Sequence, residues 1–416
     1  MSEREALGDP VALVRGEAAS LLRLLDSNGE QARIVGGAVR NALLRLPVHE
    51  IDIATTAIPD EVVRRVGSSG WKTVRTGIQH GTVTVLISGQ AFEVTTLRRD
   101  VETYGRKAKV VFGRDWVADA NRRDFTINAL SLSADGQLHD YVNGLSDLAA
   151  RRVRFIGDPA QRIAEDYLRI LRFFRFHAWY GEGAPDGDGL HACIRGRAGV
   201  ESLSRERVRA ELLKLLLAPH ATPALALMAE TDLLGSILGG VVLLASFENI
   251  TKIEAALGVE ADAVRRLGAL GVRVAEDGER LAQRLRLSNA DAERLTALEA
   301  WWRVSPELGG MSARALLYRL GPGNFADQVL VAWSRSAAGA ADRAWRTLAE
   351  LPRTWSVPEF PLKAADFMAR GFAAGPGLGA AMRAAEQAWI AADFPADPAA
   401  IQAIADRAAQ EASKTR

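Results

Sequence analysis

The sequence contains almost no cysteine and no long apolar run. Cys193 is the single cysteine among 416 residues, which excludes an intramolecular disulfide and any zinc site built from several thiolates. The apolar stretches fall well short of the roughly 18 residues that span a bilayer. The polar start Ser2-Glu3-Arg4-Glu5 does not resemble a secretory leader. We therefore expect no membrane association and a cytoplasmic, reducing compartment.

Histidine is scarce, and charge is nearly balanced. All six histidines lie within the first 220 residues, which excludes a histidine-rich metal domain in the C-terminal half. Lysine and arginine number 52 against 51 acidic residues, so the net charge indicates no partner. Residues 98–175, however, hold 15 basic and 11 acidic side chains. Nearly all the basic ones are arginine, which matches phosphate oxygens better than lysine does. A solvated surface would account for the same excess.

The pattern of apolar residues divides the chain into an α+β part and an all-α part. Short β-rich runs are expected at residues 32–35, 50–56, 83–87 and 91–97, with helices between them. After residue 158 the composition is rich in alanine, leucine and arginine, which predicts helices to the C-terminus. Six of the nine tryptophans lie from Trp301 onward, and we expect them in the core.

A double glycine and two acidic residues form the densest group of candidate functional residues. Gly36-Gly37 stands between a predicted strand and helix, where backbone N–H groups could approach a phosphate, and Arg40 follows one turn later. Glu50 and Asp52 are two apart on a predicted strand, so both carboxylates would project from one face. Such a pair suits Mg²⁺ in phosphoryl transfer, although an acidic pair on a strand is more often solvated surface. Glu93, on a later strand, is a possible third ligand.

Two further clusters carry polar residues at helical spacing. In RRDFTINA, Asp124 and Asn128 are four apart and would share a helical face, which also fits a helix cap. In EDYLRILRFFR, Asp166 and Arg169 are three apart, and Arg172 and Arg175 continue the same spacing. Intrahelical ion pairing is the simpler explanation of this second cluster.

Together the three motifs resemble a known family. The strings IVGGAVRNALLRLPVHEIDIATTA, RRDFTINAL and EDYLRILRFFRF occur in the order found in class II tRNA nucleotidyltransferases and the related bacterial poly(A) polymerases. The resemblance covers about residues 30–220, and beyond that only the helical character matches. It implies a polymerase-beta-like nucleotidyltransferase head with a small mixed sheet at 1–158. A helical neck at 159–220 and a helical body and tail at 221–416, which would bind tRNA, complete the expected chain.

The resemblance also assigns roles to individual residues. It implies that Glu50 and Asp52, with Glu93 as a possible third, hold catalytic Mg²⁺, although the family usually has aspartate at the first position. The implied nucleotide-binding residues are Gly36, Gly37, Arg40, Arg123, Asp124, Asn128, Asp166, Arg169, Arg172 and Arg175. Among these, Asp166 and Arg169 match the pair that selects CTP and ATP in place of a nucleic-acid template. The stretch 204–214 resembles the next helical motif, which we expect to be mainly structural.

The expected activity is metal-dependent addition of CCA to the 3′ end of tRNA from CTP and ATP, with release of pyrophosphate. A charged, irregular loop at Arg98–Lys109 corresponds to the segment that helps relatives change from CTP to ATP. Two alternatives remain open from the sequence. One is a poly(A) polymerase or an enzyme that adds only C or only A. The other, suggested by Glu50, is an inactive RNA-binding protein.

Overall fold

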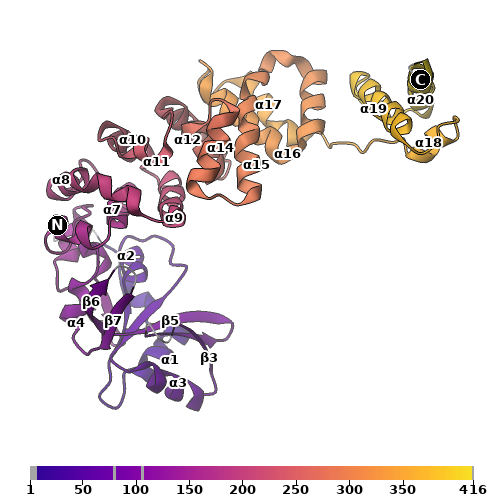
Figure 1. Ribbon diagram of the computed structural model, residues 1–416. Coiled ribbons are helices and arrows are strands. Elements are labelled where there is room, and N and C mark those ends of the chain that lie inside the picture. Colours follow the sequence, from indigo (N-terminus) through magenta and orange to yellow (C-terminus); the bar gives the residue numbers. More distant parts are fainter. Residues whose placement is uncertain (1–6, 78–80, 105–106, 415–416) are drawn as a thin grey trace. The chain divides into compact units, whose positions relative to one another are not determined.

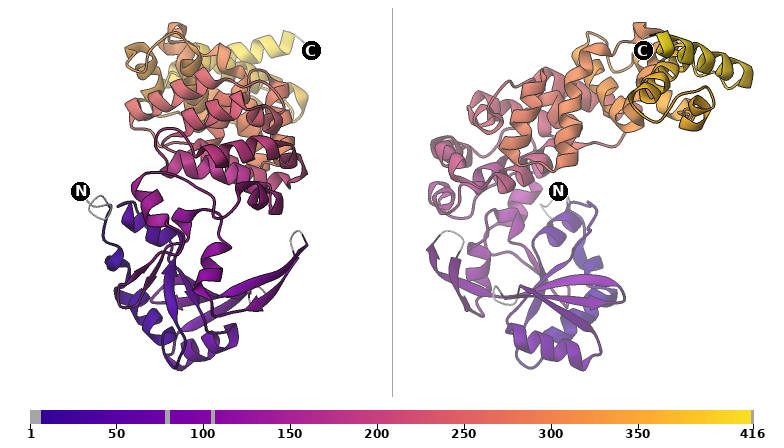
Figure 2. Two further views of the ribbon diagram at one scale, coloured as in Figure 1. Left: turned by 90° about the vertical axis from the view of Figure 1, so that its left-hand side faces the viewer. Right: turned by 45° about the vertical axis from the view of Figure 1, so that its right-hand side comes forward.

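The computed structural model describes residues 7–77, 81–104 and 107–414. The chain divides into two compact units, one ending at Ile237 and the other beginning at Leu238. Among the described residues, strands occur only before residue 140, and the remainder is helical (Figures 1 and 2). This agrees with the predicted change from an α+β part to an all-α part. No helix in the described ranges is long and apolar enough to cross a membrane.

A mixed seven-stranded sheet organises the first unit. Its strands are β1 Ala32–Val35, β2 Asp52–Thr55, β3 Lys72–Gly77, β4 Thr82–Ile87, β5 Gln90–Thr96, β8 Ser131–Ser133 and β9 Leu138–His139, in the spatial order β3-β4-β5-β2-β1-β8-β9. The pairing of β2 with β5 is parallel and the other pairings are antiparallel. All four residues of β1 are buried, as expected of a central strand.

The predicted strands and hairpin are present, with small shifts at their ends. The strand at 32–35 coincides with β1. The hairpin predicted between 83–87 and 91–97 is β4–β5, which turns through Ser88 and Gly89, both at positive φ. The strand predicted at 50–56 is shorter, because β2 begins only at Asp52. Glu50 therefore precedes the strand instead of lying on it.

The segment 98–109 corrects the sequence prediction. In place of an irregular loop, β6 Arg98–Tyr104 and β7 Lys107–Phe112 form an antiparallel two-stranded sheet of their own. The many charged residues masked the strand signal, since a two-stranded ribbon need not have the apolar alternation of a buried strand.

Helices alternate with the strands in the first part of this unit, and after β9 its elements are all helices. The helices of the whole unit are α1 Gly16–Leu25, α2 Gly37–Leu43, α3 Pro59–Ser68, α4 Trp116–Asn121, α5 Gly144–Ala149, α6 Pro159–Glu165, α7 Leu168–Tyr180, α8 Gly187–Gly196, α9 Arg205–Leu216, α10 Ala221–Glu230 and α11 Leu233–Leu238. Short 3₁₀ helices lie at Pro10–Leu13, Thr126–Asn128 (η3) and Arg197–Ser202. Proline at the first position of α3 and α6 fixes where those helices begin, as predicted for Pro59.

The second unit is helical throughout its described residues. It consists of α12 Leu244–Leu257, α13 Ala263–Gly271, α14 Ala275–Leu285, α15 Asn289–Ala297, α16 Gly309–Arg335, α17 Arg343–Thr354, α18 Ala364–Met368, α19 Pro376–Ala391 and α20 Pro398–Lys414, with 3₁₀ turns at Leu298–Arg303 (η5) and Pro306–Leu308. Gly321, at φ +74°, kinks α16 immediately before Pro322. Trp333 and Phe325 are fully buried, but Trp302 is 62 % exposed, against the expectation that these tryptophans lie in the core.

Candidate active site

The double glycine forms the turn between β1 and α2. Gly36 has φ +66°, and a Cβ on it would lie 3.0 Å from Nη1 of Arg123. The left-handed backbone conformation therefore favours glycine here, and a side chain would also displace the Arg123 guanidinium. The same guanidinium donates to the carbonyl of Asn128 at 3.2 Å, so the turn brings the first and second sequence motifs together.

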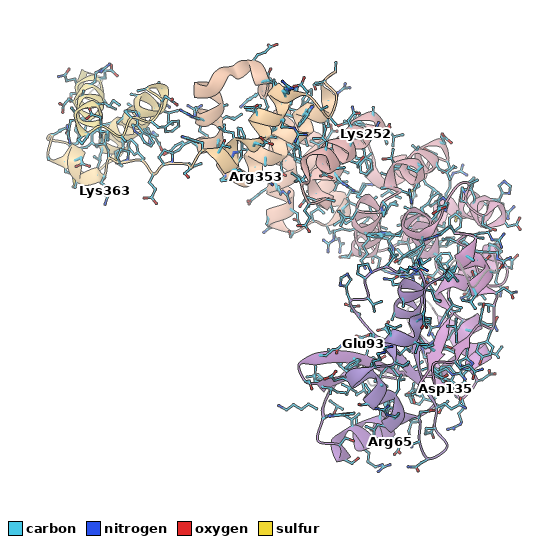
Figure 3. All side chains as sticks on the ribbon, turned by 180° about the vertical axis from the view of Figure 1, so that it is seen from behind. Arg65, Glu93, Asp135, Lys252, Arg353 and Lys363 are labelled. Atoms are coloured by element: carbon cyan, nitrogen blue, oxygen red, sulfur yellow. The ribbon has the colours of Figure 1, made fainter. Side chains whose placement is uncertain are left out.

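Three carboxylates surround the start of β2. Asp52 is the register partner of Glu93 on the parallel strand β5, so these two side chains leave the sheet as neighbours (Glu93 is labelled in Figure 3). All three side chains, including that of Glu50, are exposed. Desolvation of the carboxylate, together with the negative charges of Glu93 and Glu50, raises the pKa of Asp52. The positive charge of Arg123 has the opposite effect. Negative charge is therefore concentrated at this point.

The donor set at this point fits a divalent cation. Among the described residues no three or more histidine, cysteine or acidic side chains are already arranged to hold a metal ion. Carboxylate oxygens are nevertheless the ligands that Mg²⁺ prefers, usually one or two of them together with substrate phosphates. Desolvation and then the charges of Glu93 and Glu50 raise the pKa of Asp52, and a bound cation would offset the repulsion between these carboxylates.

Arg40 lies buried beneath the glycine turn. It donates to Oδ1 of Asn128, to the hydroxyl of Tyr180 at 2.7 Å and to Oδ1 of Asn41 at 2.9 Å. Its guanidinium also lies 3.9 Å from the centroid of the Tyr180 ring. Burial lowers the pKa of Arg40 to about 10, which leaves it a cation at neutral pH. A positive charge is thus fixed beside the glycine turn.

Asp124 and Asn128 contact each other, but not on an α-helix. The structure places a short 3₁₀ turn, η3, at Thr126–Asn128, and Nδ2 of Asn128 donates to Oδ1 of Asp124 at 3.1 Å. Arg172 forms an ion pair with the other carboxylate oxygen at 2.5 Å. Burial by itself raises the pKa of Asp124, but Arg172 and the hydrogen bonds outweigh it, so the pKa lies below its usual value.

Asp166 and Arg169 do not share one helix, which corrects the prediction from their spacing. Helix α6 ends at Glu165, Asp166 is extended with φ −159°, and α7 begins only at Leu168. Asp166 accepts from Nη2 of Arg207 at 2.6 Å and from the backbone N–H of Leu168 at 3.1 Å. Arg169 instead pairs with Glu165 and donates to the carbonyl of Arg162 at 2.6 Å. Each member of the predicted pair is held by a different partner.

The remaining predicted arginines project from α7 toward α9. Arg175 pairs with Glu211 at 2.5 Å, and Arg172 lies 3.5 Å from the same carboxylate. Since Arg172 also pairs with Asp124, it joins the second motif to the third. Acidic partners raise the pKa of Arg172 against the opposing effect of burial.

These side chains line one cavity of about 680 Å³. It is bordered by Gly36, Gly37, Arg40, Glu50, Asp52, Arg123, Asp124, Asn128, Asp166, Arg169, Arg172 and Arg175, and additionally by Leu168, Phe176 and Arg207. The cavity therefore gathers every predicted site residue except Glu93, which lies beside Asp52 on the neighbouring strand.

Leu168, Phe176 and Arg207 are lining residues that were not predicted from the sequence. The first two are apolar residues of an amphipathic helix, which nothing in the sequence distinguishes from core residues. Arg207 belongs to the stretch 204–214, which was expected to be mainly structural. Its contact with Asp166 spans 41 residues of sequence, so local spacing gave no signal of it.

A second cavity of about 610 Å³ adjoins the first. It shares Gly37, Glu50, Asp52 and Arg175 with the first cavity. Its other walls are more apolar and include Pro47, Val48, Trp179 and Tyr180, with Lys214 at one side. The carboxylates therefore stand between two spaces, one lined mainly by arginines and one lined by aromatic and aliphatic side chains.

Comparison with known proteins gives consistent results. Residues 32–154 match the family described as the poly A polymerase head domain, and residues 191–241 match a probable RNA and SrmB-binding site of polymerase A. The chain is 34 % identical over 379 residues to the mitochondrial CCA tRNA nucleotidyltransferase 1 of Homo sapiens, covering 89 % of this chain and 85 % of that protein. It is 42 % identical over 226 residues to the CCA-adding enzyme of Leuconostoc citreum, about half of each chain.

Among solved structures, the fold is similar to that of the Bacillus stearothermophilus CCA-adding enzyme in complex with CTP. The TM-score is 0.78 at 28 % identity, with 96 % of this chain and 98 % of the other covered. The similarity therefore extends through the helical half, where the sequence motifs give no information.

Proposed function

The chain belongs to the family of CCA tRNA nucleotidyltransferases, and from that premise we propose that it adds C, C and A to the 3′ end of tRNA. CTP and ATP are the proposed substrates, pyrophosphate is the product, and no nucleic-acid template is used. The observation that carries the proposal is the single cavity into which three separated sequence motifs bring their polar residues.

The proposed reaction is transfer of a nucleotidyl group to a hydroxyl. The terminal 3′ oxygen of the tRNA forms a bond to the α-phosphorus, the bond from that phosphorus to the β-phosphate oxygen breaks, and pyrophosphate leaves. Glu50 and Asp52, with Glu93 beside them, would hold Mg²⁺. When bound, this ion would neutralise the phosphate charge and lower the pKa of the attacking hydroxyl. We propose Mg²⁺ because the ligands are all oxygens.

Arginines would hold the nucleoside triphosphate in the larger cavity. Arg123 stands against the Gly36 turn, and Arg172 and Arg175 face the cavity from α7. Guanidinium groups bind phosphate oxygens in pairs of hydrogen bonds, which fixes the direction of the triphosphate. Asp124 and Asn128 are proposed to bind the ribose, whose 2′-hydroxyl distinguishes NTP from dNTP.

Asp166 and Arg169 would select the base. The carboxylate of Asp166 can accept from the exocyclic amine of cytosine or adenine, while Arg169 donates to the neighbouring ring acceptors. Uracil and guanine would present an oxygen to Asp166, and this repulsive contact would exclude them. The fixed positions of both side chains support this role, since each is already held by an ion pair.

The more apolar cavity is the proposed location of the tRNA 3′ end. It adjoins the nucleotide cavity at the carboxylates, which is where the attacking hydroxyl must lie. Trp179 and Tyr180 offer surfaces on which a terminal base could stack. Residues 1–158 would then be the catalytic head, 159–220 the neck, and 221–416 a body and tail that bind the rest of the tRNA. The proposed compartment is the cytoplasm, which the near absence of cysteine favours.

Incubation with tRNA that lacks its last three nucleotides tests this function. The purified protein, Mg²⁺ and each NTP alone or in combination would be supplied, and the products sequenced. Incorporation of two C and then one A supports the proposal. Long A tracts would indicate a poly(A) polymerase, addition of only C or only A a partial enzyme, and binding without incorporation an inactive RNA-binding protein.

A further inference from the structure

The second unit contains a separate cavity of about 400 Å³ with no part in the chemistry described above. Its walls are the first turn of α12, the end of α16, and the side chains of Arg273 and Trp301. All of these residues lie between Leu243 and Ser336, within one compact unit.

Arg335, at the end of α16, has guanidinium N–H groups without partners. Its Nη2 donates to the carbonyls of Gly268, at 3.0 Å, and Val272, which fixes the side chain in place. Its Nε and Nη1 are buried and have no hydrogen-bond partner among the described residues. The guanidinium carbon lies 4.8 Å from the centroid of the Trp301 ring. Donors buried in this way cost free energy unless an acceptor binds them.

A second positive charge stands in the same cavity. Arg273 lines it, and the electrostatic effect of Arg273 on Arg335 is repulsive. Burial and this repulsion lower the pKa of Arg335 to about 10, so it remains charged at neutral pH. The carboxylate of Asp277 attracts Arg335, but it already accepts from Arg280 at 2.6 Å and from two backbone N–H groups.

The start of α12 adds the positive end of a helix dipole. This helix has 14 residues, and its N-cap residue, Leu243, provides no side-chain hydrogen bond. Ser246, in the first turn, forms a hydrogen bond with the hydroxyl of Ser334 at 2.8 Å. The first-turn N–H groups of a helix have no intrahelical acceptor, so an anion in this cavity would meet both donors and dipole.

We propose that this cavity binds a phosphate of the tRNA backbone, held by Arg335, Arg273 and the first turn of α12. The proposal rests on the function proposed above, since it takes tRNA as the ligand. The neighbouring surface favours RNA over a free anion. Trp302, the residue after the cavity-lining Trp301, is 62 % exposed, and the guanidinium of Arg303 lies 4.9 Å from its ring centroid. An exposed aromatic ring beside an arginine is typical of surfaces that contact nucleic acid.

Binding of full-length protein to tRNA that lacks CCA, measured without nucleotide over a series of salt concentrations, tests the site. Arg335→Met and Arg273→Met should each weaken binding about tenfold and reduce the slope of log affinity against log salt by about one. Arg346→Met is the matched control, because this arginine donates to the carbonyl of Ala256 near the far end of α12 and so lies away from the cavity. Its affinity should stay within about twofold of wild type.

A folding defect in one variant would not prevent the test. If Arg335→Met does not fold, Arg273→Met decides alone, since its side chain is exposed. Affinities and salt slopes equal to those of Arg346→Met would overturn the proposal. It would also be overturned if inorganic phosphate raised the melting temperature of the wild type but not of Arg335→Met while tRNA affinity was unchanged, because the site would then be one for small anions.

Different measurements test the nucleotidyl-transfer function and the phosphate site, so the failure of one can be told from the failure of the other. Turnover at saturating tRNA should be the same in wild type, Arg335→Met and Arg273→Met, because the cavity is not part of the active site. A wild-type protein that adds no C or A, yet loses tRNA affinity in these two variants, would refute the function and leave the phosphate site in place.

Discussion

Arg207 donates from Nη2 to Oδ2 of Asp166 at 2.6 Å, and this contact connects α9 to the break between α6 and α7. Asp166 lies outside both helices, so its side-chain direction depends on this arginine and on the N–H of Leu168. A residue expected to be structural is therefore in contact with the proposed base-selecting carboxylate.

Replacing Arg207 should loosen base selection. In Arg207→Gln the carboxylate of Asp166 loses its charged partner and can adopt other rotamers, so we expect discrimination against UTP and GTP to fall about tenfold. Competition assays with labelled NTPs would measure it. Arg205→Gln, a change on the same helix but outside the cavity, is the control, and equal fidelity in the two variants would contradict the positioning role.

Removing the carboxylate itself should separate selectivity from rate. We expect Asp166→Ala to relax the preference for C and A more than it slows overall turnover, because the reacting phosphate is held elsewhere. Steady-state kinetics with all four NTPs gives both quantities. Unchanged C and A selectivity in this variant would exclude Asp166 as the base-reading group.

The ion pair between Asp124 and Arg172 should contribute to stability in a pH-dependent way. The pKa of Asp124 is lowered in the folded state, so its stabilising effect is complete above the ordinary value of 3.8 and is lost as the pH falls through the lower folded-state value. Asp124→Asn should therefore reduce the free energy of unfolding by about 1–3 kcal/mol at pH 7. Urea titrations at several pH values would show this difference shrinking in acid, whereas a constant difference would argue against the ion pair.

The β6–β7 hairpin offers a test of the change from CTP to ATP. The resemblance to the family implies that this segment assists A addition, so replacing residues 100–110 by a short turn should spare C addition and reduce A addition. Product lengths on tRNA ending in CC and on tRNA lacking CCA would separate the two steps. Equal loss of both would indicate that the hairpin supports the fold of the head and not the change of nucleotide.

The fold of the first unit was predictable where local signals are strong. The strand at 32–35, the β4–β5 hairpin and the helix opened by Pro59 all follow from periodicity and turn residues. The hairpin β6–β7 was not predicted, because charged residues interrupt the apolar pattern of both segments and the two strands pair only with each other, in a sheet of their own. The break at Asp166 has no glycine or proline to mark it, so its spacing from Arg169 was mistaken for helical spacing.

The candidate site residues were named from the sequence because three motifs together resemble a known family, and all of these residues except Glu93 line one cavity. An arginine-rich lining and an acidic pair beside a double glycine are recognisable as residue types before their positions are known. The partners of those residues were not recognisable. Glu211, Tyr180 and Arg207 act across long sequence separations, and only the fold shows that they hold Arg175, Arg40 and Asp166.

Nucleotide incorporation by Asp52→Asn is the most direct test of the central claim, that carboxylates at the start of β2 support nucleotidyl transfer. This isosteric change removes one of the converging charges, and Asp60→Asn, on an exposed residue of α3, is its control. We predict that Asp52→Asn binds tRNA like the wild type but transfers CMP slower by on the order of 10³ or more, with Asp60→Asn unaffected. An Asp52→Asn protein that transfers CMP at the wild-type rate would contradict the account.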